Sequence, residues 1–406
     1  MARIEFPAEL QKRIEESGAT DLLVGITGAA DPESLRAKVA AALRGIAPKV
    51  VVAYAGDVHA EPVVSTNGIE FAAYPLSSVS GPIAFWTQTS EAQRSVLALA
   101  AAWQARACLV VYTDLVGLNP DAVRTFAEPV LQGKSDLVMP VYPDGRYDGL
   151  INKSMLAPLY RALYGKRVRF PLPFDFCAGT NVLAKISDSG ANPGQNEPQL
   201  LWPADAVGAD GAQIGQAAVD VRHAPQTDGL DLSGVLTELA GSLFQEVETR
   251  AADWQRVRGS QPVARYGEPL NPKEDSQVID PRPMVESFAL ASRNLEEVWR
   301  LVLPPATMLE LVRLARLSPE QFRMPDAIWA RIIYDFALAY RMRRLSRAHV
   351  LGALTPLYLG WVASYTQEVG GEPAEKADFR IEQLARVFEE QKPYFVSRWR
   401  WPQRVN

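Results

Sequence analysis

Several polar side chains directly follow apolar runs that have the length and composition of buried strands. Open α/β sheets bind ligands at the carboxyl ends of their strands, so chemistry is expected at these positions. The most informative is Asp114, which closes the segment Tyr112-Thr113-Asp114 at the end of one such run. A carboxylate there can hold Mg²⁺ or Mn²⁺ against a nucleotide diphosphate, because hard oxygen ligands suit these ions. It can equally stabilise the turn before Pro120, and the spacing leaves both interpretations open. The other positions of this kind are Thr27, Gly56-Asp57, Tyr142 to Asp148 and His223.

The segments that must position these side chains alternate between short apolar runs and helical patterns. The runs LLVGI, KVVVAYA, IEFAAYP, CLVVYT and DLVMPVY predict strands, and AAVDVRHAP predicts the last one. Helices are predicted over about 80–105, over about 119–132 behind the start signal Asn119-Pro120-Asp121, and over 150–165, which ends at a glycine. This alternation predicts a mostly parallel sheet with helices on both faces.

A change of pattern divides the chain. A helix is predicted from about 233 to 257, and the following stretch is rich in proline and lacks periodicity. Beyond it, four segments show apolar residues at helical spacing with charged opposite faces. We therefore expect an α/β domain over 1–258, a linker over 259–282 and an α-helical domain over 283–406.

Composition excludes several classes of protein. The 406 residues are 48% apolar and 22% charged, which is typical of a folded globular chain rather than a disordered one. The formal charge of −5 argues against a nucleic-acid partner. Two cysteines are too few for a disulfide scaffold, the N-terminus lacks the apolar core of a secretory signal, and no apolar run reaches the length of a transmembrane segment. A cytoplasmic location is expected.

Longer segments carry a resemblance to a known family. They are the run from DLVMPVYPDGRYDG to RVRFPLPFDF, the segment ADGAQIGQAAVDVRHAP, and IWARIIYDFALAY, TPLYLGWVASY and FEEQKPYFVSRW in the helical part. Together they resemble the GT-A glycosyltransferases related to mannosylglycerate synthase and glucosyl-3-phosphoglycerate synthase. The resemblance implies a GT-A fold, a Rossmann-like, mostly parallel sheet, followed by an α-helical domain. It also implies transfer of a hexose from a nucleotide-sugar to a small anionic acceptor of the glycerate or phosphoglycerate type.

The resemblance assigns roles to particular residues. Asp114 matches the second acid of the family's DxD motif and His223 its metal-binding histidine, so the two are expected to hold a divalent cation, Mg²⁺ or Mn²⁺. Asp57 and Asp114 fall on the donor side, and Asp175 matches a catalytic acid. The residues expected to contact the acceptor are Arg146, Asp148 and Asn152. A solvated turn at PDGRYDG is the alternative for Arg146 and Asp148, and a structural hydrogen-bond acceptor is the alternative for Asp175.

The chain also departs from the family pattern on the donor side. Tyr112 replaces the first DxD acid, and Ser80-Gly81-Pro82 stands where a lysine-containing segment is expected at the pyrophosphate. Loss of both groups removes electrostatic stabilisation of the departing diphosphate. The alternative hypothesis is therefore a catalytically silent relative that acts in binding or assembly. A third interpretation is that the helical domain mediates homo-oligomerisation.

Overall fold

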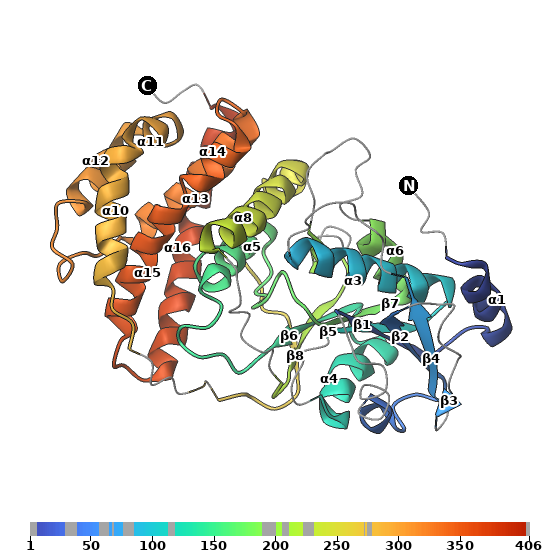
Figure 1. Ribbon diagram of the computed structural model, residues 1–406. Coiled ribbons are helices and arrows are strands. Elements are labelled where there is room, and N and C mark those ends of the chain that lie inside the picture. Colours follow the sequence, from blue (N-terminus) through green and yellow to red (C-terminus); the bar gives the residue numbers. More distant parts are fainter. Residues whose placement is uncertain are drawn as a thin grey trace. The chain divides into compact units, whose positions relative to one another are not determined.

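The computed structural model describes residues 6–28, 39–56, 69–75, 85–112, 118–188, 200–204, 211–221, 231–271, 273 and 278–402, and the backbone of 65–66. The chain forms two compact units (Figure 1). The first comprises Met1–Pro143, Val168–Gln226 and Pro262–Asn271, and the second comprises Asp144–Arg167, Thr227–Gln261 and Pro272–Asn406.

One sheet organises the first unit. Its strand order is β3-β4-β2-β1-β5-β7-β6-β8-β9, counted over the described residues. The strands are β1 (Leu22–Thr27), β2 (Val50–Ala55), β3 (Ser65–Thr66), β4 (Ile69–Tyr74), β5 (Ala107–Tyr112), β6 (Leu137–Val141), β7 (Phe176–Gly179), β8 (Ile214–Ala218) and β9 (Ala264–Tyr266). Pairing is parallel except that β3 is antiparallel to β4 and β7 is antiparallel to both β5 and β6. The carboxyl ends of β5 and β6 therefore lie at the same edge as the amino end of β7.

Helices cover both faces of this sheet, as the buried strands require. Figure 1 shows α3 (Phe85–Ala102) and α6 (Thr180–Asp188) on one face and α4 (Pro120–Leu131) on the other. The side chain of Asn119 caps α4 by accepting a hydrogen bond from the backbone N–H of Ala122 at 2.8 Å. On the α3 face, Gly25 of β1 lets Val96 approach so closely that an added Cβ would lie 1.9 Å from Val96 Cγ1. The helix α1 (Ala8–Ser17) precedes β1.

Helices make up most of the second unit. A π-helix, η1 (Asn152–Leu156), leads into α5 (Ala157–Tyr164), and α8 (Leu232–Thr249) and α9 (Ala251–Trp254) follow later in the chain. The remaining helices are α10 (Arg282–Asn294), α11 (Glu296–Val302), α12 (Pro305–Leu314), α13 (Asp326–Met342), α14 (Arg347–Gly352), α15 (Thr355–Val369) and α16 (Ala374–Arg400). Stacked rings fill the core of this unit; for example, Phe395 stacks on both Tyr334 and Trp254, with ring centroids 4.6 and 4.9 Å apart.

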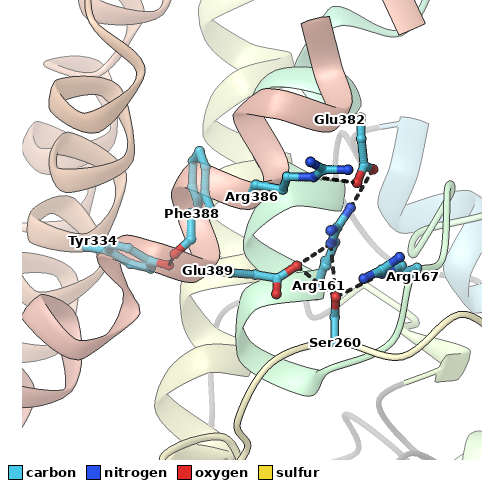
Figure 2. Close-up of polar contacts among 8 residues, drawn as sticks. All are labelled: Arg161, Arg167, Ser260, Tyr334, Glu382, Arg386, Phe388 and Glu389. Carbon is cyan, nitrogen blue, oxygen red and sulfur yellow. Dashed lines mark hydrogen bonds and ion pairs between the residues drawn. The ribbon is translucent and has the colours of Figure 1, made fainter. Parts of the chain in front are cut away.

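An ionic cluster joins α5 to α16 within the second unit (Figure 2). The guanidinium of Arg161, whose side chain is 7% exposed, forms ion pairs with Glu382 and Glu389 of α16. Ser260 accepts hydrogen bonds from Arg161 Nε at 3.1 Å and from Arg167 Nε at 3.0 Å, and donates to Glu389 Oε1 at 2.7 Å. Burial opposes ionisation of Glu382, but the hydrogen bond and charge of Arg161 outweigh it and lower the pKa of that carboxyl. The cluster thus gives the buried guanidinium of Arg161 two oppositely charged partners and one hydrogen-bonding partner from distant parts of the chain.

The predicted fold class, a mostly parallel α/β sheet followed by an α-helical C-terminal part, is confirmed. The division of the chain differs from the expected domains of 1–258 and 283–406. Residues 144–167 and 227–261 pack with the later helices, and residues 264–266, inside the expected linker, pair with β8 as an additional strand. The last predicted strand lies earlier than AAVDVRHAP indicates, because β8 is Ile214–Ala218. In the described residues, no helix combines the length and apolar character needed to cross a membrane.

Candidate functional site

The carboxylate of Asp175 hydrogen-bonds to residues at the ends of two strands, at the carboxyl edge of the sheet. The residue directly precedes β7, and its side chain is fully buried. Its Oδ1 accepts a hydrogen bond from the backbone N–H of Tyr112, the last residue of β5, at 2.8 Å. Its Oδ2 accepts a hydrogen bond from the hydroxyl of Tyr142, which follows β6. One carboxylate therefore sets the positions of the chain at the ends of both strands.

A half-buried aromatic cluster surrounds the end of β5. The antiparallel register of β5 and β7 pairs Val110 with Phe176, so Tyr112 comes to lie opposite Phe174, and their ring centroids are 5.4 Å apart. Phe174 in turn stacks on Trp86 of α3 at 4.5 Å with an interplanar angle of 18°. Phe85 contacts the rings of Trp86, Tyr112 and Phe174 edge-on at 5.7 to 5.9 Å. Flat apolar rings of this kind can stack against a nucleobase or the apolar face of a sugar.

The buried side chain of Gln93 holds this cluster in place. Its Nε2 donates to the backbone carbonyls of Pro173 and Phe174 at 3.0 and 3.1 Å. Gln93 lies on α3, about two turns beyond Phe85 and Trp86 at the start of that helix. The sequence analysis did not single out Gln93, Trp86 or Phe85, because a mid-helix glutamine and aromatic residues carry no signal of their own there. For Phe85 and Trp86 the only available signal is their position at the start of the helix that covers β5.

Arg146, an expected acceptor contact, belongs to the second unit and is 7% exposed. Its Nη1 donates to the carbonyl of Val369, the last residue of α15, at 2.9 Å. The carbonyl of Arg146 accepts a hydrogen bond from the Tyr365 hydroxyl at 2.8 Å. A cation at a helix C-terminus is favourable because the last carbonyls carry partial negative charge. These contacts give Arg146 a structural task whether or not it also meets a ligand.

Asp148 and Asn152 lie nearby on the same segment. Asp148 is exposed, and its Oδ2 accepts the backbone N–H of Gly145 at 2.8 Å, which closes a turn. Asn152 is the first residue of η1, and single π-helical turns inside helices are frequent at functional sites. A neighbouring group that the sequence analysis missed is Lys153, a buried lysine whose Nζ lies 2.9 Å from Asp144 Oδ2 and donates to the carbonyl of Gly145 at 2.5 Å. Asp144 and Lys153 are nine residues apart, a spacing that predicts no pairing.

The predicted donor and metal residues, Asp57, Asp114 and His223, lie outside the described residues. Within the described part of the chain, no group of three side chains is arranged to hold a metal ion. The described end of β5 carries the phenol of Tyr112 in an aromatic cluster, which does not fit the ligation of a hard divalent cation. Cation binding by Asp114 and His223 therefore stays a prediction from the sequence.

The arrangement at the sheet edge is suited to recognition. It combines two strand ends that hydrogen-bond to one buried carboxylate with a set of half-buried aromatic rings. Asp114 follows the fixed residue Tyr112 by two positions in the sequence. The described groups can position and stack a ligand, whereas Asp175 uses both of its carboxylate oxygens in hydrogen bonds to the protein.

Comparisons with known proteins give the following picture. No protein-family model matches the chain, and no curated protein matches it. Among solved structures, glucosyl-3-phosphoglycerate synthase from Mycobacterium tuberculosis in complex with phosphoglyceric acid is similar over 60% of this chain and 85% of that chain, with 17% identity and a TM-score of 0.38. The crystal structure of a mycobacterial protein is similar over 59% of this chain and 77% of that chain, with 16% identity and a TM-score of 0.38. A likeness of this degree transfers neither a substrate nor a mechanism.

Proposed function

We propose that this chain is a glycosyltransferase that binds a nucleotide-sugar at the carboxyl edge of its sheet and moves the hexose to a small anionic acceptor of the glycerate or phosphoglycerate type. The motifs that resemble the GT-A glycosyltransferases support this proposal. The observation that carries it is the anchoring of Tyr112 by Asp175, because it fixes the strand end from which the chain continues to Asp114.

In this proposal the donor and acceptor meet different residues. Asp57 contacts the nucleoside, and Asp114 and His223 hold a divalent cation, which when bound neutralises charge on the diphosphate. The aromatic cluster of Phe85, Trp86, Tyr112 and Phe174 offers a stacking surface for the donor. Asp175 acts as the group that positions β5 and β6. The acceptor is assigned to Arg146, Asp148 and Asn152, since an arginine recognises carboxylate or phosphate.

A calorimetric titration with GDP and with UDP, each with and without Mn²⁺, tests the donor side. We expect one nucleotide to bind, with Mn²⁺ strengthening the binding, and we expect Asp114→Asn to abolish that strengthening. Asp121→Asn is the matched control, because it removes one carboxylate from an exposed position at the start of α4. The proposal is contradicted if neither GDP nor UDP binds at millimolar concentration. Mass spectrometry of products formed from the nucleotide-sugar with glycerate or 3-phosphoglycerate then identifies the acceptor.

A catalytically silent binding protein is the second candidate, and one observation favours it. Tyr112 occupies the position of the first DxD acid, and its ring packs against Phe85 and Phe174. Nucleotide binding that is indifferent to Mn²⁺, together with no turnover of nucleotide-sugars, would identify this function. Nucleotide-dependent metal binding gained in Tyr112→Asp would support it further. Homo-oligomerisation, the third interpretation, is tested by light scattering of the full chain.

A further inference from the structure

A pocket with a volume of about 320 Å³ lies among the helices of the second unit. Its lining comes from α11, α13, α14, α16 and the adjoining connections. The volume falls at the lower end of the range found for small-molecule sites. The pocket contains none of the residues assigned to sugar transfer, so an inference about it does not depend on the proposed function.

The charged residues of this pocket are three arginines, Arg300, Arg344 and Arg398, and one acid, Asp335. The side chains of Asp335 and Arg398 are 1% and 12% exposed, whereas Arg300 and Arg344 are exposed. The buried pair therefore occupies the inner part of the pocket, and the other two arginines lie toward solvent. The positive excess is local, since the whole chain is slightly acidic.

The buried pair is in close ionic contact. Arg398 Nε lies 2.6 Å from Asp335 Oδ1. The other oxygen, Asp335 Oδ2, accepts the hydroxyl of Tyr394 at 2.8 Å. The single N–H of Arg398 Nε is directed to this pair, so a ligand at the pocket has to meet the guanidinium through its remaining nitrogens.

The remaining walls of the pocket are mostly apolar. Leu338 and Met342 project from α13, Val350 from α14, and Pro304 and Pro305 precede or begin α12. An inorganic ion would leave these walls without contact, and an uncharged apolar molecule would gain no charge-assisted contact from Arg344 and Arg398. A molecule that joins an anionic group to a short apolar body satisfies both.

We propose that this pocket binds a small amphipathic anion, a carboxylate or phosphate group attached to an apolar body of a few carbon atoms. The anionic group meets Arg398 and Arg344, and the apolar body lies against α13 and α14. Arg300 contributes less, because it already forms an ion pair with Glu296 at 2.5 Å. Arg398 exchanges part of its contact with Asp335 for contact with the ligand, and no covalent step is involved.

Calorimetric titration of the full chain with hexyl phosphate and with hexanoate tests the site. We expect at least one of them to bind. Inorganic phosphate lacks the apolar body and 1-hexanol lacks the anionic group, so we expect each of these two to bind at least about tenfold more weakly. Arg344→Ala should weaken binding by about tenfold or more, because it removes a charge-assisted contact. Arg316→Ala, which removes another exposed arginine of the second unit that does not line the pocket, should leave the dissociation constant unchanged.

A second variant fills the pocket without changing its charge. Ala339 lines the pocket from α13 and is partly exposed, so Ala339→Phe should block binding while the helical circular dichroism stays as in the wild type. The inference is overturned if neither amphipathic probe binds at 5 mM, if inorganic phosphate or hexanol binds as tightly as the amphipathic probe, or if binding is unaffected by both Arg344→Ala and Ala339→Phe. It is supported if both variants weaken binding and Arg316→Ala does not.

Discussion

Asp335 should make the stability of the protein depend on pH in a direction opposite to that of an ordinary carboxylate. Burial raises the pKa of Asp335 to about 7 from a reference value of 3.8, although Arg398, the Tyr394 hydroxyl and Arg331 all favour the ionised form. Between these two values the folded chain keeps the proton and the unfolded chain releases it. The folded state therefore binds more protons, and the free energy of unfolding falls as the pH rises through this window.

The size of the effect follows from the two pKa values. Their separation, 7 − 3.8 = 3.2, corresponds to an upper limit of about 4 kcal/mol at about 1.4 kcal/mol for each pKa unit. Over the practical range from pH 5 to pH 8, the same relation gives a loss of about 2.5 kcal/mol. The Asp335 side chain is only 1% exposed, so little of this is screened by solvent.

Comparison with Asp335→Asn isolates this contribution. Urea unfolding of both proteins is followed by circular dichroism at each pH, and the free energy of the variant is subtracted from that of the wild type. All other titrating groups cancel, and Arg398 stays charged throughout. We expect the free energy of unfolding of the wild type, relative to that of the variant, to fall by about 2.5 kcal/mol from pH 5 to pH 8.

The exposed carboxylate of Asp253 in α9 provides the control. Asp253→Asn should show a difference from the wild type that varies by only a few tenths of a kcal/mol over the same range, as is usual for surface substitutions. A flat difference for Asp335→Asn, or one that favours the wild type increasingly as the pH rises, would refute the reasoning from burial.

Two further predictions concern packing. Arg161→Met removes the cation shared by Glu382 and Glu389, and the free energy of unfolding should fall by about 1 to 3 kcal/mol in urea titrations. The loss stays below that expected for a fully buried pair, because the side chain of Glu382 is 36% exposed and keeps its ion pair with Arg386. Adding Glu382→Gln and Glu389→Gln should recover part of the loss, and equal stability of the single and triple variants would contradict the role of charge. Gly25→Ala places a Cβ against Val96 and should destabilise by about 1 to 3 kcal/mol in thermal and urea unfolding. Adding Val96→Ala should cost less in the Gly25→Ala background than in the wild type, and strict additivity would show that the two residues do not clash.

The sequence predicted the regular parts of the fold because these parts carry local signals. The start of α4 is an example, since Asn119 and Pro120 form a cap that needs no other segment. Strand β9 carries no such signal. Its residues, Ala264 to Tyr266, are exposed or partly exposed and contain an arginine, and they form a strand only because β8 offers a free edge. The helix α12 was likewise not singled out among the apolar helical segments.

The contacts of the candidate site likewise join residues that are far apart in the sequence. The resemblance points to Asp175 as a catalytic acid, but the partners that hold its carboxylate lie 63 and 33 residues away. No spacing rule connects such positions. The pairing of Asp335 with Arg398 is also distant in sequence, and it depends on how α13 and α16 pack. The division into units escaped prediction for a related reason, because composition changes near residue 258 while the packing follows other boundaries.

The ionic cluster around Arg161 has a consequence for the biosynthesis of the protein. Its two carboxylate partners come 221 and 228 residues later in the chain. At about 5 to 20 residues per second, the ribosome supplies them roughly 10 to 45 s after Arg161. Until then α5 lacks the helix that compensates its buried charge, although β9, the last strand described for the sheet of the first unit, has already been synthesised. The second unit can therefore acquire its packed form only at the very end of translation, because α16 packs against α5 and α13. In a nascent chain stalled before residue 382, the guanidinium of Arg161 stays in water and the surface that α16 covers stays open to solvent.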